Sequence, residues 1–163
     1  MVALPLAVGA LAVVAVSAGI RLAPDDTSTW HQDPLTTRAP DNPNWYRLLP
    51  GDAATQTVPE RDASAPIFDA SVASLESTFD EVAMGDGRVK VLAGSAAEGF
   101  VTYVQRSALM GYPDYVSVRF IEVDEANSTL ALLSRSRYGS SDLGVNQKRV
   151  QRWIDATQAN LGK

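Results

Sequence analysis

Residues 134–150 are unusually rich in side chains that could do chemistry, and they lie between a strand-like run and a helix-like run. Backbone N–H groups at a helix N-terminus, together with arginine side chains, can hold a phosphate or a carboxylate. The first two arginines are two positions apart on the expected strand, so both point to the same face. The side chains expected to bind an anionic ligand are Arg135, Arg137, Asp142, Asn146 and Arg149, with Asp114 from an earlier loop.

The same residues also allow a purely structural interpretation. Arg137 or Arg149 could pair with Asp142 or Asp114 and brace the turn before the last helix. Asp142 could also satisfy free N–H groups at the start of that helix. The sequence leaves the ligand site and the structural brace open as alternatives.

The chain has no cysteine and one histidine, His31. The missing cysteines exclude disulfides, thiolate catalysis and cysteine-based metal sites. A single histidine argues against Ser-His-Asp catalysis and excludes polyhistidine metal sites. We therefore expect no metal, no cofactor and a non-catalytic domain. The enzymatic alternative is a hydrolase- or transferase-type activity that uses Asp142 and Asp114 with an arginine clamp.

The composition is that of an ordinary globular protein, with 45% hydrophobic and 20% charged residues among 163. The formal net charge is -5, which argues against a nucleic-acid partner. The length allows one domain and an appendage.

Residues 2–20 carry no charge and are long enough to cross a hydrocarbon core of roughly 30 Å as a helix. We expect residues 1–21 to form an uncleaved transmembrane anchor, so that the membrane is one partner. A cleaved signal peptide is the alternative, because Val16, Ser17 and Ala18 provide small residues near its end. Arg21 favours a cytoplasmic location for the end of this helix under the positive-inside rule, but Asp25 and Asp26 follow it directly.

Residues 22–63 are expected to form an extended connector. Residues 22–66 contain seven of the nine prolines, and no helical or alternating period is visible. Aromatic side chains in a connector need burial, so Trp30-His31 and residues 45–49 are predicted to dock on the domain. Alternatively, Trp30 could lie at the lipid headgroups and not dock on the domain.

Residues 64–163 are expected to form an α+β domain. Phe68, Val72, Leu75, Phe79 and Val82 make one apolar helical stripe that ends near Gly85. A last helix starts near Val145 and turns Val145, Val150, Trp153, Ile154 and Thr157 inward. Between the helices lie four strand-like runs, residues 88–94, 100–108, 115–123 and 129–137. The predicted fold is thus an antiparallel sheet of about four strands with two flanking helices, preceded by a transmembrane helix.

The run from Ser134 to Val150 resembles the signature of the domain-of-unknown-function family 1499, which reads roughly S-x-S-R-x-G-x-x-D-x-G-x-N-x-x-R-V. The resemblance implies an uncharacterised bacterial, single-pass membrane protein of the cell envelope, with its soluble domain in the periplasm. Similar proteins often carry paired acids in the loop at residues 111–115. Here one acid is replaced by an aromatic residue, which weakens any mechanism that needs two carboxylates there.

Three functions follow as hypotheses. The first is a binding domain for an anionic small molecule, a lipid headgroup or an envelope protein. The second is the enzyme with Asp142 and Asp114. The third is a structural subunit of an envelope complex. An open cleft with unpaired arginines would favour the first two, and a closed, fully paired corner would favour the third.

Overall fold

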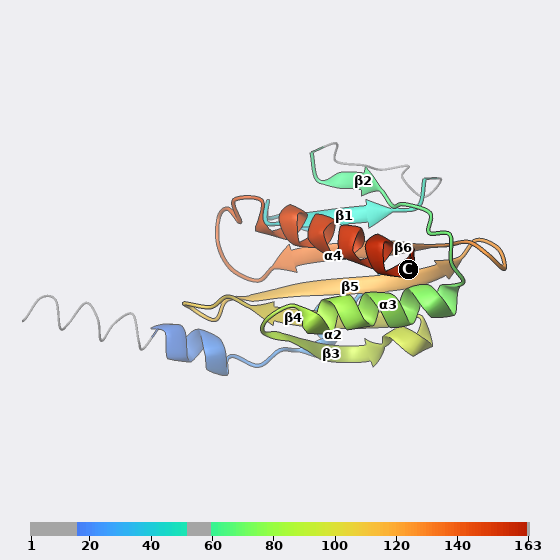
Figure 1. The fold of residues 1–163 in the computed structure, drawn as a ribbon. Coiled ribbons are helices and arrows are strands. Elements are labelled where there is room, and N and C mark those ends of the chain that lie inside the picture. The colour runs from blue at the N-terminus through green and yellow to red at the C-terminus, as the bar shows by residue number, and fades with distance from the viewer. Residues whose placement is uncertain (1–15, 52–59, 163) are drawn as a thin grey trace, which may run out of the picture.

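A computed structural model describes residues 16–51 and 60–162. Its centre is a six-stranded sheet with the strand order β2-β1-β6-β5-β4-β3 (Figure 1). Neighbouring strands are antiparallel, except that β1 and β2 are parallel. The strands are β1 (Trp45–Leu49), β2 (Asp62–Ser64), β3 (Val89–Ser95), β4 (Phe100–Arg106), β5 (Pro113–Glu122) and β6 (Ser128–Ser136), and a short 3-10 helix η1 (Ala96–Glu98) joins β3 to β4.

Two helices, α3 (Val72–Gly85) and α4 (Val145–Leu161), lie side by side on one face of the sheet (Figure 1). Ser71 caps α3 by accepting a hydrogen bond from the Ser74 N–H at 3.3 Å. Each helix buries one stripe of side chains against the sheet, as a period of 3.6 residues requires. The buried residues are Leu75, Phe79 and Ala83 on α3, and Asn146, Arg149, Val150, Trp153, Ile154 and Thr157 on α4.

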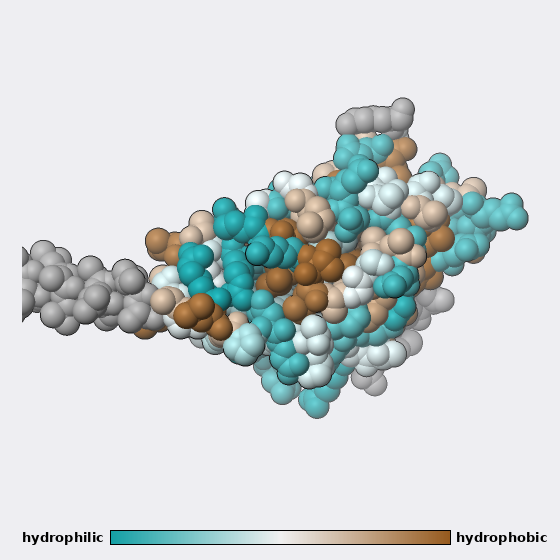
Figure 2. Space-filling model, turned by 90° about the horizontal axis from the view of Figure 1, so that it is seen from below, coloured by the Kyte–Doolittle hydropathy of each residue, from teal (hydrophilic) through white to brown (hydrophobic). Residues whose placement is uncertain are grey.

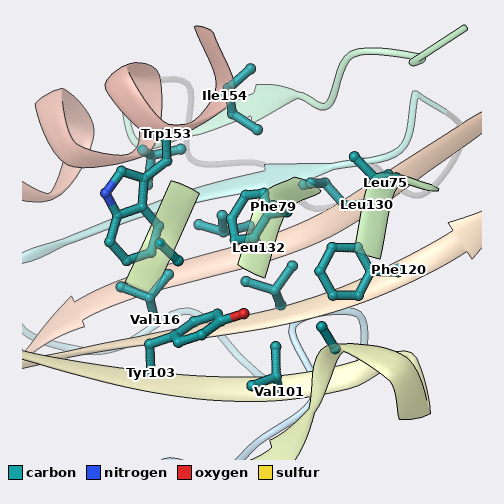
Figure 3. Close-up of a cluster of buried hydrophobic side chains, with 14 of the residues drawn as sticks. Leu75, Phe79, Val101, Tyr103, Val116, Phe120, Leu130, Leu132, Trp153 and Ile154 are labelled. Atoms are coloured by element: carbon teal, nitrogen blue, oxygen red, sulfur yellow. The ribbon is translucent and has the colours of Figure 1, made fainter. Parts of the chain in front are cut away.

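The main core fills the space between these helices and the sheet (Figure 3). Phe79 lies at its centre, edge-on to Trp153 at 5.9 Å and to Phe120 at 5.6 Å between ring centroids. Leu130 and Leu132 of β6 are fully buried beside it. These aromatic contacts fix the position of α4, and therefore the place where its N-terminal residues meet β6.

The opposite face of the sheet is covered by residues 23–37, which we call the strap. It contains the four-residue helix α2 (Thr27–Trp30), which is drawn in blue behind the sheet in Figure 1. Trp30 stacks on Tyr115 of β5 with 4.0 Å between ring centroids. The predicted docking of Trp30 on the domain is thus confirmed, and Trp30 docks on the sheet face opposite α3 and α4. Because helices and strap cover both faces, every residue of β6 is buried.

The predicted fold class is wrong. The sheet has six strands and is mixed, whereas four antiparallel strands were expected. The four expected strands correspond to β3–β6, and β1 and β2 come from the segment predicted as a connector. Trp45–Leu49 shows no alternation because it is buried on both sides, and β2 has only three residues. Their pairing partners, and not their local pattern, make them strands.

The transmembrane helix that was part of the predicted fold class is not found among the described residues. No helix within the described residues has both the length and the apolar character needed to cross a membrane, and residues 1–15 of the predicted anchor lie outside that part of the chain. Residues 16–22 are helical and contact the β4–β5 loop. Ser17 donates to the Met110 carbonyl at 3.2 Å, and Arg21 donates to the Ala108 and Leu109 carbonyls at 3.1 Å each. Val145, predicted to point inward, is exposed.

The first prediction concerns β1 and β2, the two strands that the sequence pattern did not indicate. Arg47 of β1 pairs with Asp62 of β2 at 2.7 Å, and both side chains are buried. Asp62→Ala should lower the free energy of unfolding by roughly 3–5 kcal/mol, because it leaves a buried guanidinium without its carboxylate. The matched control is Asp41→Ala, whose pair with Arg38 is fully exposed, and it should cost less than about 1 kcal/mol. Urea denaturation measures both, and equal small losses would contradict the structural role.

Candidate functional site

On the helix side of the sheet, four of the six predicted site residues meet where β6 ends and α4 begins: Asp114, Asp142, Asn146 and Arg149. Asn146 is completely buried there. Its amide NH₂ lies within hydrogen-bond distance of three acceptors, and its carbonyl oxygen accepts from two donors. The acceptors are the Asn44 carbonyl (3.1 Å), Ser136 Oγ (2.9 Å) and Asp142 Oδ2 (2.8 Å), and the donors are Ser134 Oγ (2.6 Å) and Arg149 Nη1 (2.9 Å).

Arg149 is the charged centre of this network, and only 4% of its surface is exposed. Its Nη2 pairs with Asp114 Oδ2 at 2.5 Å, and its Nε donates to Gln105 Oε1 at 2.6 Å. Nη1 donates to Ser134 Oγ at 3.1 Å. A buried guanidinium is tolerated when its charge is paired and its nitrogens have hydrogen-bond partners, and here Asp114 pairs the charge and each nitrogen has a partner.

Asp142 occupies the N-terminus of α4. Its carboxylate accepts hydrogen bonds from the backbone N–H groups of Gly144 (3.1 Å) and Asn146 (3.0 Å). Burial alone would raise the pKa of the Asp142 carboxyl, but these hydrogen bonds outweigh it and lower the pKa. The chain's own carboxylate therefore takes the position that a bound anion would occupy at this helix end.

The corner formed by Asp114, Asp142, Asn146 and Arg149 is thus a closed network. Its arrangement corresponds to the structural alternative for Arg149, which pairs with Asp114, whereas Asp142 binds the helix backbone. A hollow of about 210 Å³ borders it, and its charged lining residues are Glu60, Arg61 and Asp142. With two carboxylates and one arginine, this lining is not that of an anion site.

Arg135 and Arg137 lie on the other face, towards the strap. Arg135 Nη2 donates to the carbonyls of Thr29 and Trp30 at 3.1 Å each, and its guanidinium lies 4.9 Å from the Trp30 ring centroid. Arg137 Nη1 donates to the Pro24 carbonyl at 2.9 Å. The structure therefore divides the predicted site residues between the two faces of the sheet.

The environment of Arg135 is unusual for a buried cation. Only 9% of its surface is exposed, and it forms no ion pair within residues 16–51 and 60–162. Its Nε–H has no acceptor in that part of the chain. Burial lowers the pKa of the Arg135 guanidinium.

Two further arginines on this face were missed by the sequence reasoning. Arg106 pairs with Asp25 of the strap at 2.7 Å, and Arg119 pairs with Asp33 at 2.7 Å. Tyr115, from the same face, donates to Asp25 at 2.7 Å. Strand alternation could have placed these side chains on one face, but no local signal paired them with residues more than 80 positions away.

His31 of the strap stacks on Phe100 with 4.0 Å between ring centroids, and its Nδ1 lies 2.9 Å from Thr102 Oγ1. Burial, followed by the positive charge of Arg119, lowers the pKa of His31 below its ordinary value of 6.5. The neutral imidazole is therefore the form that the docked strap favours.

A third region is a groove of about 600 Å³ between α3 and β3. Figure 2 looks at the molecule from the β3 side and shows hydrophobic residues gathered in the middle of this side, bordered by hydrophilic ones. Val91, Ala96 and Ala97 line the groove, and burial raises the pKa of Glu76 at its wall. The polar residues of its lining are Glu76, Ser77, Asp80 and Ser95, and Asp80 accepts a hydrogen bond from Tyr103 at 2.7 Å.

The described residues contain no group of three His, Asp or Glu side chains that could hold a metal ion. The fold and its contacts define a single α+β domain, with two helices on one sheet face and an arginine-held strap on the other. The chain belongs to the DUF1499 family of proteins of unknown function, whose profile matches residues 36–156. Searches of curated proteins and of solved structures gave no match.

The closed corner leads to the second prediction. Arg149→Ala should lower the free energy of unfolding by roughly 3–5 kcal/mol, because it strands the Asp114 carboxylate and opens the network. Arg152→Ala, one turn later and 56% exposed in its pair with Asp86, should cost less than about 1 kcal/mol. Denaturant unfolding measures both. A loss below about 1 kcal/mol for Arg149→Ala would favour a ligand role instead.

The third prediction concerns pH. The pKa of His31 is lower in the folded chain than in the unfolded chain, so the unfolded chain binds a proton more readily. The contribution of the neutral ring to the free energy of unfolding is therefore fully present above pH 6.5, and it is lost as the pH falls through the lowered pKa. Between about pH 7.5 and 5.5 the melting temperature should fall. His31→Phe keeps the ring stack without the proton, so its melting temperature should fall less. Parallel pH profiles for the two proteins would contradict this assignment.

Proposed function

We propose that the domain is a non-catalytic binding domain that holds an extended chain segment on the sheet face opposite its helices. The observation that carries the proposal is the set of arginines on this face, each of which contacts the strap. Four of them, Arg106, Arg119, Arg135 and Arg137, define the surface that we call the arginine face. Arg47 also donates to the strap, at the Thr37 carbonyl, but it is paired with Asp62 of β2 and is not included.

The contacts resemble ligand recognition more than core packing. The strap adds no strand to the sheet, and it is held by side chains that bind its carboxylates and carbonyl groups. Charge-assisted hydrogen bonds of this kind give orientation and specificity. Most of the strap, residues 23–35, lies outside the region that matches the family, whereas all four arginines lie inside it. The family domain thus contributes the binding face, and the segment before it contributes the occupant.

The enzymatic alternative gains no support from the geometry. Asp142 caps α4 and Asp114 pairs with Arg149, so neither carboxylate is available for proton transfer or nucleophilic attack. Arg149, the arginine that would have to act as the clamp beside Asp114, is buried in the same network. An activity at this corner would require most of these hydrogen bonds to break.

Holding the strap fixes the domain next to the segment that precedes it. Helical residues 16–22 contact the β4–β5 loop directly before the strap begins. A cell-envelope location, with the domain in the periplasm, stays a prediction that rests on the apolar composition of residues 2–20 and on the family resemblance. Cell fractionation with protease protection tests it.

The fourth prediction tests the binding face. The double variant Asp25→Asn, Asp33→Asn removes both carboxylates that contact the arginine face. Since charge-assisted hydrogen bonds contribute about 1.5–3 kcal/mol each, thermolysin should cleave the strap at least about tenfold faster. Mass spectrometry locates the cuts.

The matched control is Asp26→Asn. Among the described residues, the Asp26 carboxylate accepts hydrogen bonds only from Ser28 and Thr29 of the strap, and asparagine caps a helix equally well. Its cleavage rate should equal that of the unmodified chain. An unchanged rate in the double variant, with the domain folded, would contradict the proposed function.

A further inference from the structure

We propose that the arginine face is a docking surface for an acidic, extended segment of another protein, and that the strap occupies this surface in the partner's absence. The proposal rests on the proposed function and adds the chemistry of the external partner. Three observations carry it: the charge balance of the face, the type of contact that holds the strap, and the position of Gln32.

The strap neutralises the arginine face incompletely. The four arginines of this face contact it, but among the described residues Asp25 and Asp33 are the only strap carboxylates that pair with them. A fifth arginine in contact with the strap, Arg47, has its own carboxylate partner in Asp62. Arg135 is nine-tenths buried and receives only carbonyl oxygens from the strap, while its Nε–H has no acceptor among the described residues. A segment that brought a third carboxylate to Arg135 would complement the face better than the strap does.

The strap is also held in a way that allows exchange. Its helix α2 has four residues and buries none of them. The strap docks through a few side chains, chiefly the stacked rings of Trp30 and His31 and the two ion pairs, without a backbone ladder to the sheet. Such contacts can be replaced by equivalent ones from a partner while the sheet stays intact.

The contacts define what the partner must carry. An acid at the position of Asp25 meets Arg106 and Tyr115, an aromatic ring five residues later stacks on Tyr115, and an acid three residues after that meets Arg119. Gln32 Oε1 lies 3.5 Å from Arg135 Nη1. A glutamate at this position has the same shape as Gln32 and would supply the missing carboxylate. The partner segment is therefore acidic, with one aromatic residue between the acids.

The test uses the full chain with Asp25→Asn, Trp30→Ala and Asp33→Asn, in which the strap is weakened but the arginine face is intact. The probe is a fluorescent synthetic peptide with the sequence of residues 22–37, and binding is followed by anisotropy. The peptide should bind this variant at least tenfold more tightly than it binds the unmodified chain, whose own strap competes. A peptide with Asp25→Asn and Asp33→Asn should bind at least tenfold more weakly, and added salt should weaken binding of the acidic peptide.

The sharpest comparison is the peptide with Gln32→Glu, which should bind severalfold more tightly than the natural sequence. This gain should disappear when the chain also carries Arg135→Met, which keeps the length of the side chain without its charge. Circular dichroism and the melting temperature establish that each variant is folded.

The outcomes separate the two proposals. If thermolysin shows that the strap of the weakened variant is released and no peptide binds, the docking surface is overturned while the proposed function stands. If the strap is not released, the proposed function itself fails. If the weakened variant instead forms dimers by light scattering and excludes the peptide, a second copy of this chain is the occupant and the external partner is overturned. Equal affinity of the natural peptide and the peptide with Gln32→Glu would overturn the role of Arg135.

Discussion

The rest of the structure depends on one constraint, the burial of β6 on both faces and along its full length. The strand pairs with β5 along its whole length and with β1 at residues 132–135. Its last three residues, Ser134, Arg135 and Ser136, are polar and yet buried. Burial of a polar group without a hydrogen bond costs roughly 2–7 kcal/mol, so each of them needs a partner from the layer that covers it. The N-terminus of α4 and the strap are placed where they provide those partners.

The two layers meet this requirement differently. On the helix side, Asn146 and Arg149 bind Ser134 and Ser136, and Asp114 balances the charge, so the corner is closed. On the strap side, Arg135 is met by carbonyl oxygens and by the face of Trp30, without a carboxylate among the described residues. A complete buried network is rigid and costly to open, whereas an incomplete one leaves an advantage for a better ligand. The helix side therefore belongs to the stability of the domain, and the strap side is the surface where we propose that binding takes place.

The family signature contains residues of both kinds, which explains why it is hard to interpret from the sequence. Asp142 at a helix N-terminus and Arg149 further along the same helix have the chemistry of an anion site, but in the fold Asp142 itself is the anion and Arg149 has its own carboxylate. Binding sites and internal braces use the same atoms and the same spacing. What distinguishes them is whether a carboxylate from elsewhere in the chain fills the site, and Asp114 lies 35 residues before Arg149.

The sequence by itself determined the elements whose patterns are local. The apolar stripe of α3 from Val72 to Val82, the start of α4 near Val145, the four strands that became β3–β6 and the shared face of Arg135 and Arg137 all follow from periods of 3.6 or 2 residues. Phe68, predicted on the same helical stripe, lies before α3 and forms a β-bridge with Ser128 instead. Only the tertiary structure decided that β1 and β2 join the sheet, that their pair is parallel, and that the predicted site residues separate onto two faces. The contacts of the strap likewise link residues as far apart as Arg137 and Pro24, 113 positions away. The periodic spacing of apolar residues is visible in a short run of sequence and predicts a helix or a strand. The contact partner of a residue far along the chain depends on how all the elements pack around β6, and a local pattern carries no information about that packing.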